Sequence, residues 1–228
     1  MIKVMCNVRV IEFFIDSIDR TEFEGKDVLE VGSKYINGSV RPLIEKFCNP
    51  NKYVGVDIET GKFVDVVVPA EKLVLFFGEN KFDIVISTEM LEHVMDWRIV
   101  IHNLKKVLKP GGIIYITTRS KGFGYHAYPF DFWRYEIEDI KKIFSDFEIM
   151  ILEKDTEPGI LLKARKPLDF KPNDLNSISL YSIVENKRVS YIPKKLTIIR
   201  KFSILVGSAF SSLLIIRLIR KLTKGKKL

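Results

Sequence analysis

The chain is poor in the residues that build disulfide frameworks and metal clusters. Its 228 residues include two cysteines, Cys6 and Cys48, and three histidines. This cysteine content excludes a disulfide-rich secreted scaffold and a cysteine-based zinc site, so we expect a reducing compartment and no bound metal. The N-terminus also lacks the basic head and apolar block of a secretory signal peptide, which favours a cytoplasmic location.

Acidic residues are missing from the last part of the chain. Residues 1–185 carry 25 Lys+Arg and all 29 Asp+Glu, for a net charge of −4, whereas residues 186–228 carry 12 Lys+Arg and no acid, for a net charge of +12. The whole net charge of +8 therefore comes from the tail, which predicts an anionic partner for that segment.

The tail also lacks a hydrophobic run long enough to cross a bilayer without tilting. Residues 202–216 form an uncharged run of 15 residues, which as a helix spans about 22 Å, against roughly 30 Å of hydrocarbon. With basic residues at both ends, this segment suits an amphipathic helix on an anionic membrane surface. A tilted span, a homo-oligomer interface and a basic arm on nucleic acid are alternatives. The last is disfavoured because the tail is rich in aliphatic and poor in aromatic residues.

Composition and length indicate one α/β domain with an extension. An apolar content of 46% excludes wholesale disorder and supports a substantial core. We expect a cofactor-binding domain at residues 1–166, a linker at 167–193 and a basic amphipathic helix at 194–228. The expected location is peripheral, on the cytoplasmic face of a membrane.

Apolar runs alternate with helical patterns through the first 166 residues. Strands are expected at 28–31, 53–57, 64–68, 82–87 and 113–118, and helices at 8–18, 39–47, 98–108 and 135–144. Ser39 is the expected N-cap of the second helix, and the Pro110-Gly111-Gly112 turn is expected to end the third. Residues 147–152 and 160–164 flank a Pro158-Gly159 turn, as a terminal hairpin would.

Four motifs follow one another at fixed spacing: VLEVGS at 28–33, YVGVD at 53–57, FDIVISTEMLEHV at 82–94 and VLKPGG at 107–112. The first three read as buried parallel strands that end in a turn or in polar residues. Because ligands of open α/β sheets bind at the carboxyl ends of the strands, these ends mark the expected site.

Over residues 23 to 166 these motifs resemble the class I S-adenosylmethionine-dependent methyltransferases, in particular the type 11-like family. The resemblance implies a Rossmann-like fold with a seven-stranded, mostly parallel sheet, helices on both faces and an antiparallel last strand. Here a basic helical C-terminal extension would follow it. The resemblance also implies S-adenosylmethionine as the cofactor.

The resemblance assigns the cofactor-binding residues. Glu30 and Gly32 would hold the methionine end, and Asp57 the ribose, where its two oxygens match a vicinal diol. Glu30 has an alternative role as a turn-stabilising carboxylate. Further cofactor contacts are expected from the turn, from the end of the second strand, from the residue near the adenine and from the wall after the fourth strand, namely Ser33, Asn37, Gly38, Ile58, Ala70, Ser87, Thr88 and Glu89.

Two features depart from the family pattern. The usual Gly-x-Gly-x-Gly turn is replaced by a longer loop over residues 32–39, with glycine only at Gly32 and Gly38. The Asp that often follows the third strand is also absent, so adenine would be read by the backbone near Ala70 or by Glu71. The missing glycine pattern likewise disfavours a nicotinamide-dependent oxidoreductase.

The segment at 118–135 is expected to form the acceptor loop, because glycines and aromatics fill it at the ligand-bearing edge of the sheet. A neutral imidazole at His126 can accept a proton from a substrate hydroxyl. Asp131 can orient that imidazole or act as the base, and Arg134 can hold an anionic group. The alternative is a structural corner that packs the loop onto the next helix.

These features predict an S-adenosylmethionine-dependent methyltransferase. The expected reaction is O-methylation of a small-molecule, glycan or lipid-linked acceptor at the membrane surface. The tail and the acceptor loop carry the expectation about the acceptor. The alternatives are a non-catalytic scaffold with the cofactor-binding fold, which docks a membrane partner, and a methyltransferase acting on RNA, although a nucleic-acid partner is disfavoured.

Overall fold

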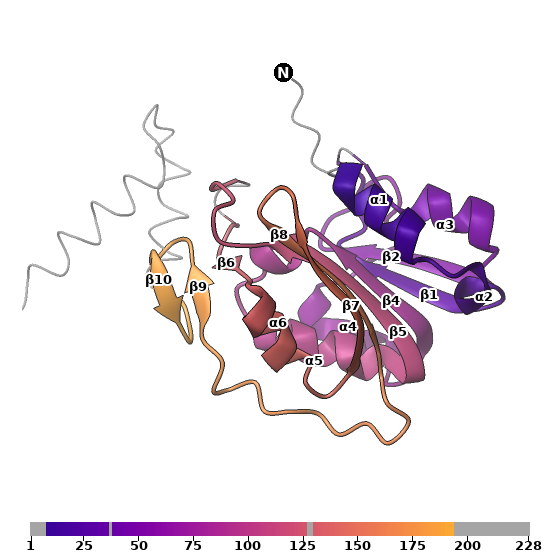
Figure 1. Ribbon diagram of the computed structural model, residues 1–228. Coiled ribbons are helices and arrows are strands. Elements are labelled where there is room, and N and C mark those ends of the chain that lie inside the picture. The colour runs from indigo at the N-terminus through magenta and orange to yellow at the C-terminus, as the bar shows by residue number, and fades with distance from the viewer. Residues whose placement is uncertain (1–7, 37, 127–129, 194–228) are drawn as a thin grey trace, which may run out of the picture.

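A seven-stranded sheet with the order β3-β2-β1-β4-β5-β8-β7 forms the centre of the computed structural model (Figure 1). The structure describes residues 8–36, 38–126 and 130–193. The strands are β1 Asp27–Val31, β2 Lys52–Asp57, β3 Val66–Val67, β4 Phe82–Thr88, β5 Leu108–Arg119, β7 Glu148–Asp155 and β8 Gly159–Arg165. β3, β2, β1, β4 and β5 pair in parallel, and β8 runs antiparallel to both of its neighbours. The predicted fold, including its terminal hairpin, is confirmed.

Both faces of the sheet are covered by helices because side chains alternate along each strand. On β1, Val28 packs into a cluster with α1 (Val8–Ser17), α2 (Arg20–Phe23) and α3 (Arg41–Cys48). Leu29 and Val31 point to the opposite face, into the larger cluster with α4 (Leu73–Phe77), α5 (Trp97–Val107) and α6 (Ile137–Ile143). Short 3₁₀ turns, η1 (Ala70–Lys72) and η2 (Leu91–His93), follow the strand ends near the expected site.

Two local expectations about helix ends were wrong. The N-cap of α3 is Val40, with no side-chain cap, while the Ser39 hydroxyl accepts a hydrogen bond from the Arg41 amide over 3.1 Å. α5 ends at Val107, before the Pro-Gly-Gly turn, because Leu108 already has an extended backbone and pairs with Phe82. The turn therefore lies within β5.

Residues 167–193 differ from the expected linker. They contribute β9 (Leu180–Ser182) and β10 (Lys187–Val189), which form a small sheet with β6 (Trp133–Arg134) in the order β10-β9-β6. The small sheet is seen beside α6 in Figure 1. Leu180 and Val184 are fully buried in the larger core. Their apolar burial explains why this segment is ordered.

The expected C-terminal helix at 194–228 lies outside the described residues, as do residues 1–7 with Cys6. Within the described part of the chain, none of the helices has the length and apolar character needed to cross a membrane.

Candidate active site

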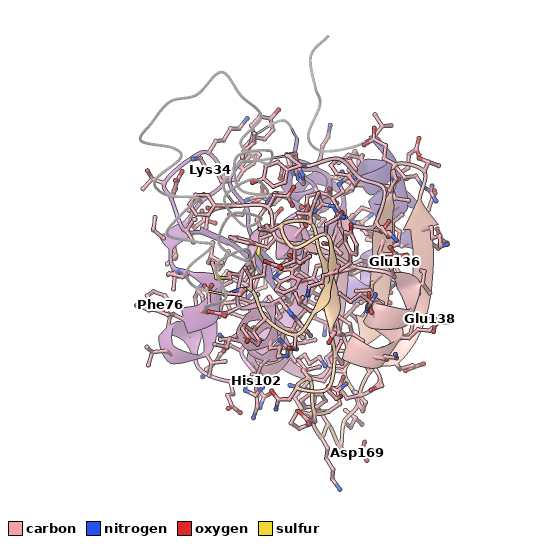
Figure 2. The ribbon with its side chains drawn as sticks, turned by 90° about the vertical axis from the view of Figure 1, so that its left-hand side faces the viewer. Lys34, Phe76, His102, Glu136, Glu138 and Asp169 are labelled. Carbon is pink, nitrogen blue, oxygen red and sulfur yellow. The ribbon has the colours of Figure 1, made fainter. Side chains whose placement is uncertain are left out.

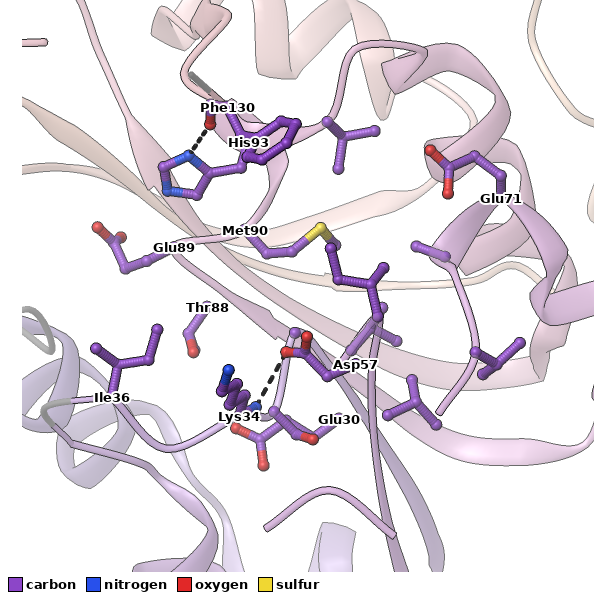
Figure 3. A pocket seen from close by; sticks show the side chains of 18 of the residues that line it. Glu30, Lys34, Ile36, Asp57, Glu71, Thr88, Glu89, Met90, His93 and Phe130 are labelled. Carbon is purple, nitrogen blue, oxygen red and sulfur yellow. Dashed lines mark hydrogen bonds between the residues drawn. The ribbon is translucent and has the colours of Figure 1, made fainter. Parts of the chain in front are cut away.

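A cavity of about 470 Å³ opens at the carboxyl ends of β1, β2 and β4 (Figure 3). This size is typical of small-molecule sites. Among the expected cofactor residues, those that line the cavity are Glu30, Gly32, Ser33, Gly38, Asp57, Ile58, Ala70, Thr88 and Glu89. Ser87 does not line it, because its side chain is completely buried beneath the wall. Asn37 lies outside the described residues.

The turn after β1 is held against β2 by its backbone. The amides of Gly32 and Ser33 both donate to the Val56 carbonyl, over 2.9 and 3.0 Å. Gly32 has a φ of +82°, and a Cβ at this position would lie 2.7 Å from Met90 Cγ. A side chain there would therefore strain the backbone and displace Met90. The glycine keeps the floor of the cavity open.

Asp57 lies at the exit of β2 with its carboxylate on the cavity wall. Its Oδ2 accepts a hydrogen bond from the Lys34 amide over 3.1 Å, and its Oδ1 accepts one from the Glu59 amide over 3.3 Å. Each carboxylate oxygen has a second lone pair. The carboxylate is thus fixed in place while it keeps acceptor capacity for a diol.

Glu30 forms a buried pair with a tyrosine. Its side chain points to the α1 and α3 face, where the Tyr53 hydroxyl donates to Oε2 over 2.8 Å. Burial raises the pKa of the Glu30 carboxyl to about 7, although the Tyr53 hydrogen bond and the charge of Arg41 act in the opposite direction. Glu30 thus lines the cavity while its carboxyl is held by Tyr53 of β2.

Glu89 forms the wall after β4. Burial and the charge of Glu92 raise the pKa of the Glu89 carboxyl to about 8, against the opposing charge of Arg119, with which it forms an ion pair. The Thr117 hydroxyl donates to Glu89 Oε1 over 2.9 Å. Figure 3 shows Glu89 and His93 at one end of the cavity and Glu30 and Asp57 at the other.

Asp131 and Arg134 form a buried corner. Two guanidinium nitrogens of Arg134 donate to the two Asp131 oxygens over 2.6 and 2.8 Å, and the other hydrogen bonds of Arg134 go to backbone carbonyls of Phe123, Gly124 and Trp133. Arg134 is 1% exposed and Asp131 is fully buried. These contacts favour the structural-corner alternative over binding of an anionic substrate group by Arg134.

Asp131 is also unsuited to act as a base. Burial alone would raise the pKa of its carboxyl, but hydrogen bonds from Arg134 and His126 lower it to about 2. Its Oδ2 accepts the His126 amide over 2.8 Å and lies 3.1 Å from His126 Nδ1. Asp131 therefore holds His126 in place, which agrees with the first of the two roles expected for it.

His126 packs against His93, a histidine that was not among the site residues expected from the sequence. The rings of His93 and His126 pack edge to face with their centroids 4.7 Å apart. His93 lines the cavity, whereas His126, Asp131 and Arg134 are not among its described lining residues. The sequence feature that could have identified His93 is its place directly after Glu92, in the polar segment that follows the fourth strand.

Comparisons with known proteins agree with this geometry. A family model described as a methyltransferase domain matches residues 7–148. The ubiquinone biosynthesis O-methyltransferase of Vibrio atlanticus is 29% identical over 116 residues, which cover 46% of this chain and 49% of that protein. Phosphoethanolamine N-methyltransferase 2 of Caenorhabditis elegans is 39% identical over 54 residues, 24% of this chain and 12% of that protein. The matched stretches thus span less than half of either relative.

A solved structure with the same fold is the 1,6-didemethyltoxoflavin-N1-methyltransferase of Burkholderia thailandensis with bound S-adenosylhomocysteine. Its TM-score is 0.52 at 16% identity, covering 63% of this chain and 72% of that one. At this identity the likeness concerns the fold. Because the family model covers more than half of the sequence, the chain belongs to the methyltransferase-domain family of class I S-adenosylmethionine-dependent methyltransferases.

Proposed function

We propose that the chain binds S-adenosylmethionine in the cavity and methylates an oxygen of a small-molecule, glycan or lipid-linked acceptor. One observation carries the proposal: a single cavity contains the anchored Asp57 carboxylate and, farther along its wall, Glu89 and His93. The Asp57 carboxylate suits a ribose diol, and Glu89 with His93 suits a polar acceptor. When bound, the cofactor supplies an electrophilic methyl group on a positively charged sulfur.

The residues at the cavity fit this cofactor. Asp57 offers acceptor capacity for two hydroxyls, and the turn at Gly32 leaves room for close approach of a ligand to the backbone. Glu30 and Glu89 contribute carboxyl groups that suit the positive charges of a sulfonium and an amine. Ala70 and Glu71 line the part of the cavity proposed for adenine.

At the acceptor end, the chain's own residues would position a hydroxyl and take up its proton. His93 lies on the cavity wall, and its Nδ1 lies 2.5 Å from the Phe130 carbonyl oxygen. A carbonyl only accepts, so Nδ1 carries the hydrogen and Nε2 keeps its lone pair. Among the described residues, His93 Nε2 therefore offers an imidazole lone pair on the cavity wall. His126 packs against His93. Methyl transfer needs alignment of the acceptor more than a strong base.

The membrane-linked part of the proposal rests on the sequence of residues 194–228, with its basic ends and apolar middle. A helix of this kind would hold the chain at an anionic surface. Such attachment would bring a lipid-linked or glycan acceptor to the cavity from the cytoplasmic side of the membrane.

The experiment is methyl transfer from labelled S-adenosylmethionine to two acceptor sets that bear the same hydroxyl groups, one in solution and one lipid-linked in vesicles. We expect turnover with a hydroxyl acceptor, and faster turnover with its lipid-linked form. Cofactor binding without transfer to any acceptor would instead favour the non-catalytic scaffold. Transfer to RNA alone would contradict the proposed acceptor class.

A further inference from the structure

The turn after β4 and the acceptor loop bring three metal-ligating side chains together. Glu92 and His93 belong to η2, and His126 lies in the loop after β5. One ligand atom from each of them lies within 4.8 Å of the others. Glu92 Oε1 is 3.8 Å from His93 Nε2 and 3.9 Å from His126 Nε2. The three atoms therefore face a common point.

Glu92 is a buried carboxylate with one oxygen unused. Its side chain is completely buried, and its Oε2 accepts the Thr118 hydroxyl over 2.8 Å. Its Oε1 is buried without a hydrogen-bond partner among the residues that the structure describes. The nearby arginines are paired elsewhere, Arg119 with Glu89 and Arg134 with Asp131. A buried anionic oxygen without a partner is costly unless a cation reaches it.

Both imidazoles place their Nε2 atoms near that oxygen. The Phe130 carbonyl oxygen holds the hydrogen of His93 on Nδ1, and the Asp131 carboxylate, 3.1 Å from His126 Nδ1, favours the same tautomer there. The two Nε2 atoms then face Glu92 Oε1 as acceptors. Acceptors that converge on an anionic oxygen repel it unless a positive charge lies between them.

The distances distinguish a metal ion from a shared proton. At 3.8 and 3.9 Å, the nitrogen and oxygen atoms are too far apart for a hydrogen bond. Two metal–ligand bonds of about 2.0–2.2 Å at a tetrahedral angle, however, separate their ligand atoms by roughly 3.3–3.6 Å, so the ligand atoms would need to move together by only a few tenths of an ångström to bind an ion. A carbonyl or carboxylate behind each imidazole is also the usual support of a metal-bound histidine.

We propose that Glu92, His93 and His126 bind a divalent transition-metal ion, for which Zn²⁺ is the best-suited candidate. Two imidazoles and one carboxylate match the ligand set of open zinc sites, which keep a position for an outside ligand. His93 lines the cavity, so that position faces the acceptor end. Glu89 is not a ligand, because Arg119 and Thr117 occupy its oxygens. The expectation that the chain has no metal site is revised by this proposal.

Metal binding does not depend on the proposed methyl transfer, but the role of the ion rests on it. With the ion bound, His93 Nε2 would be a ligand and not a proton acceptor, so the ion would take over that role. It would hold the acceptor oxygen at its open position beside the cavity and, as a Lewis acid, would help the hydroxyl release its proton to solvent. Asp131 and Arg134 would be positioning residues, because they fix His126 without touching the ion.

The test is calorimetric titration of ZnCl₂ into the full chain, prepared without a histidine tag and freed of metal. We expect one Zn²⁺ per chain, affinity lowered at least tenfold in His93→Ala and in His126→Ala, and no specific binding in the double variant. His102→Ala is the matched control. This histidine is exposed on α5 and lies at the opposite edge of the molecule from Lys34, which lines the cavity (Figure 2).

Two further measurements keep the outcomes separate. Co²⁺ in place of Zn²⁺ should give a visible absorption band that the double variant lacks. Urea unfolding reports whether each variant is folded, independently of cofactor binding. Absence of Zn²⁺ binding to the wild type, or equal binding by the wild type and a folded double variant, would overturn the metal site. Specific Zn²⁺ binding without methyl transfer would contradict the proposed function and support the metal site.

Discussion

The Tyr53 hydroxyl donates a hydrogen bond over 2.8 Å to Glu30, a carboxyl that is 2% exposed beneath the cavity. Burial holds the pKa of Glu30 at about 7, against 4.5 for a free carboxyl. The folded chain therefore keeps the proton in a range where the unfolded chain has lost it, so the stability of the fold depends on pH.

We predict that the free energy of unfolding of the wild type falls, relative to Glu30→Gln, as the pH rises from 4.5 to 7. The stabilisation that the protonated carboxyl contributes is complete below the pKa that Glu30 has in the unfolded chain. It is lost as the pH rises through the pKa that Glu30 has in the folded chain. The shift corresponds to about 3 kcal/mol. Urea unfolding at pH 5 and pH 8 measures it, and a constant difference between the two proteins at both pH values would refute the buried protonated state.

Arg134→Met should destabilise the fold by about 3–5 kcal/mol, because it leaves the buried Asp131 carboxylate without its guanidinium partner. Lys141→Met is the matched control. Lys141 also pairs with a carboxylate three residues away, Glu138, but both side chains are exposed, so little change is expected. Urea unfolding compares the two variants. If Arg134→Met kept its stability and lost only acceptor affinity, Arg134 would be a substrate-binding residue after all.

Gly32→Ala should reduce both stability and affinity for S-adenosylhomocysteine. The added Cβ would meet Met90 Cγ at 2.7 Å on a backbone with a φ of +82°. Gly25→Ala separates the two effects, because Gly25 has a φ of +69° and nothing within 4 Å of an added Cβ. The control should lose about 1–2 kcal/mol from backbone strain, and Gly32→Ala should lose more. Equal losses would show that Met90 yields to the added methyl group.

The full chain should co-sediment with vesicles that contain anionic lipid and should bind neutral vesicles weakly. A chain ending at Pro193 keeps the Ser190 carbonyl that Arg98 contacts and the buried Ile192, so it should fold, bind cofactor and ignore vesicles. At 1 M salt, where screening acts over about 3 Å, buried leucines and isoleucines should retain part of the binding. A stable oligomer that the truncation dissolves, with no vesicle binding, would make the tail an interface.

Much of the fold was predictable from short-range pattern. The apolar runs of β1, β2 and β4, and the residues Gly32, Asp57 and Glu89 at or just after their ends, indicated the strands and the edge of the sheet at which the cavity opens. The small sheet was not predictable. The pairing of Trp133 and Arg134 in β6 with Ser182 and Tyr181 in β9 joins segments nearly fifty residues apart, and no local periodicity reports such a contact.

For the same reason, the part of the cavity wall near Asp57 and Gly32 was predictable, whereas the surroundings of His126 were not. Asp57 and Gly32 follow directly from the end of a strand. The neighbourhood of His126, in contrast, depends on how its loop folds back onto η2, which brings His93 and Glu92 beside it. Ser87, at the end of the apolar run of β4, is completely buried and is not among the described lining residues, whereas Thr88 and Glu89 after it line the cavity.

Calorimetric titration of S-adenosylhomocysteine into the full chain and into Asp57→Ala tests the cofactor site most directly. We predict one molecule bound per chain, and binding weakened in the variant by about 1.5–3 kcal/mol, the range for a lost hydrogen bond to a charged group. Glu59→Ala, two residues away with an exposed side chain, should bind as the wild type does. Absence of binding to the wild type, or unchanged affinity in a folded Asp57→Ala variant, would contradict the assignment of this cavity to the cofactor.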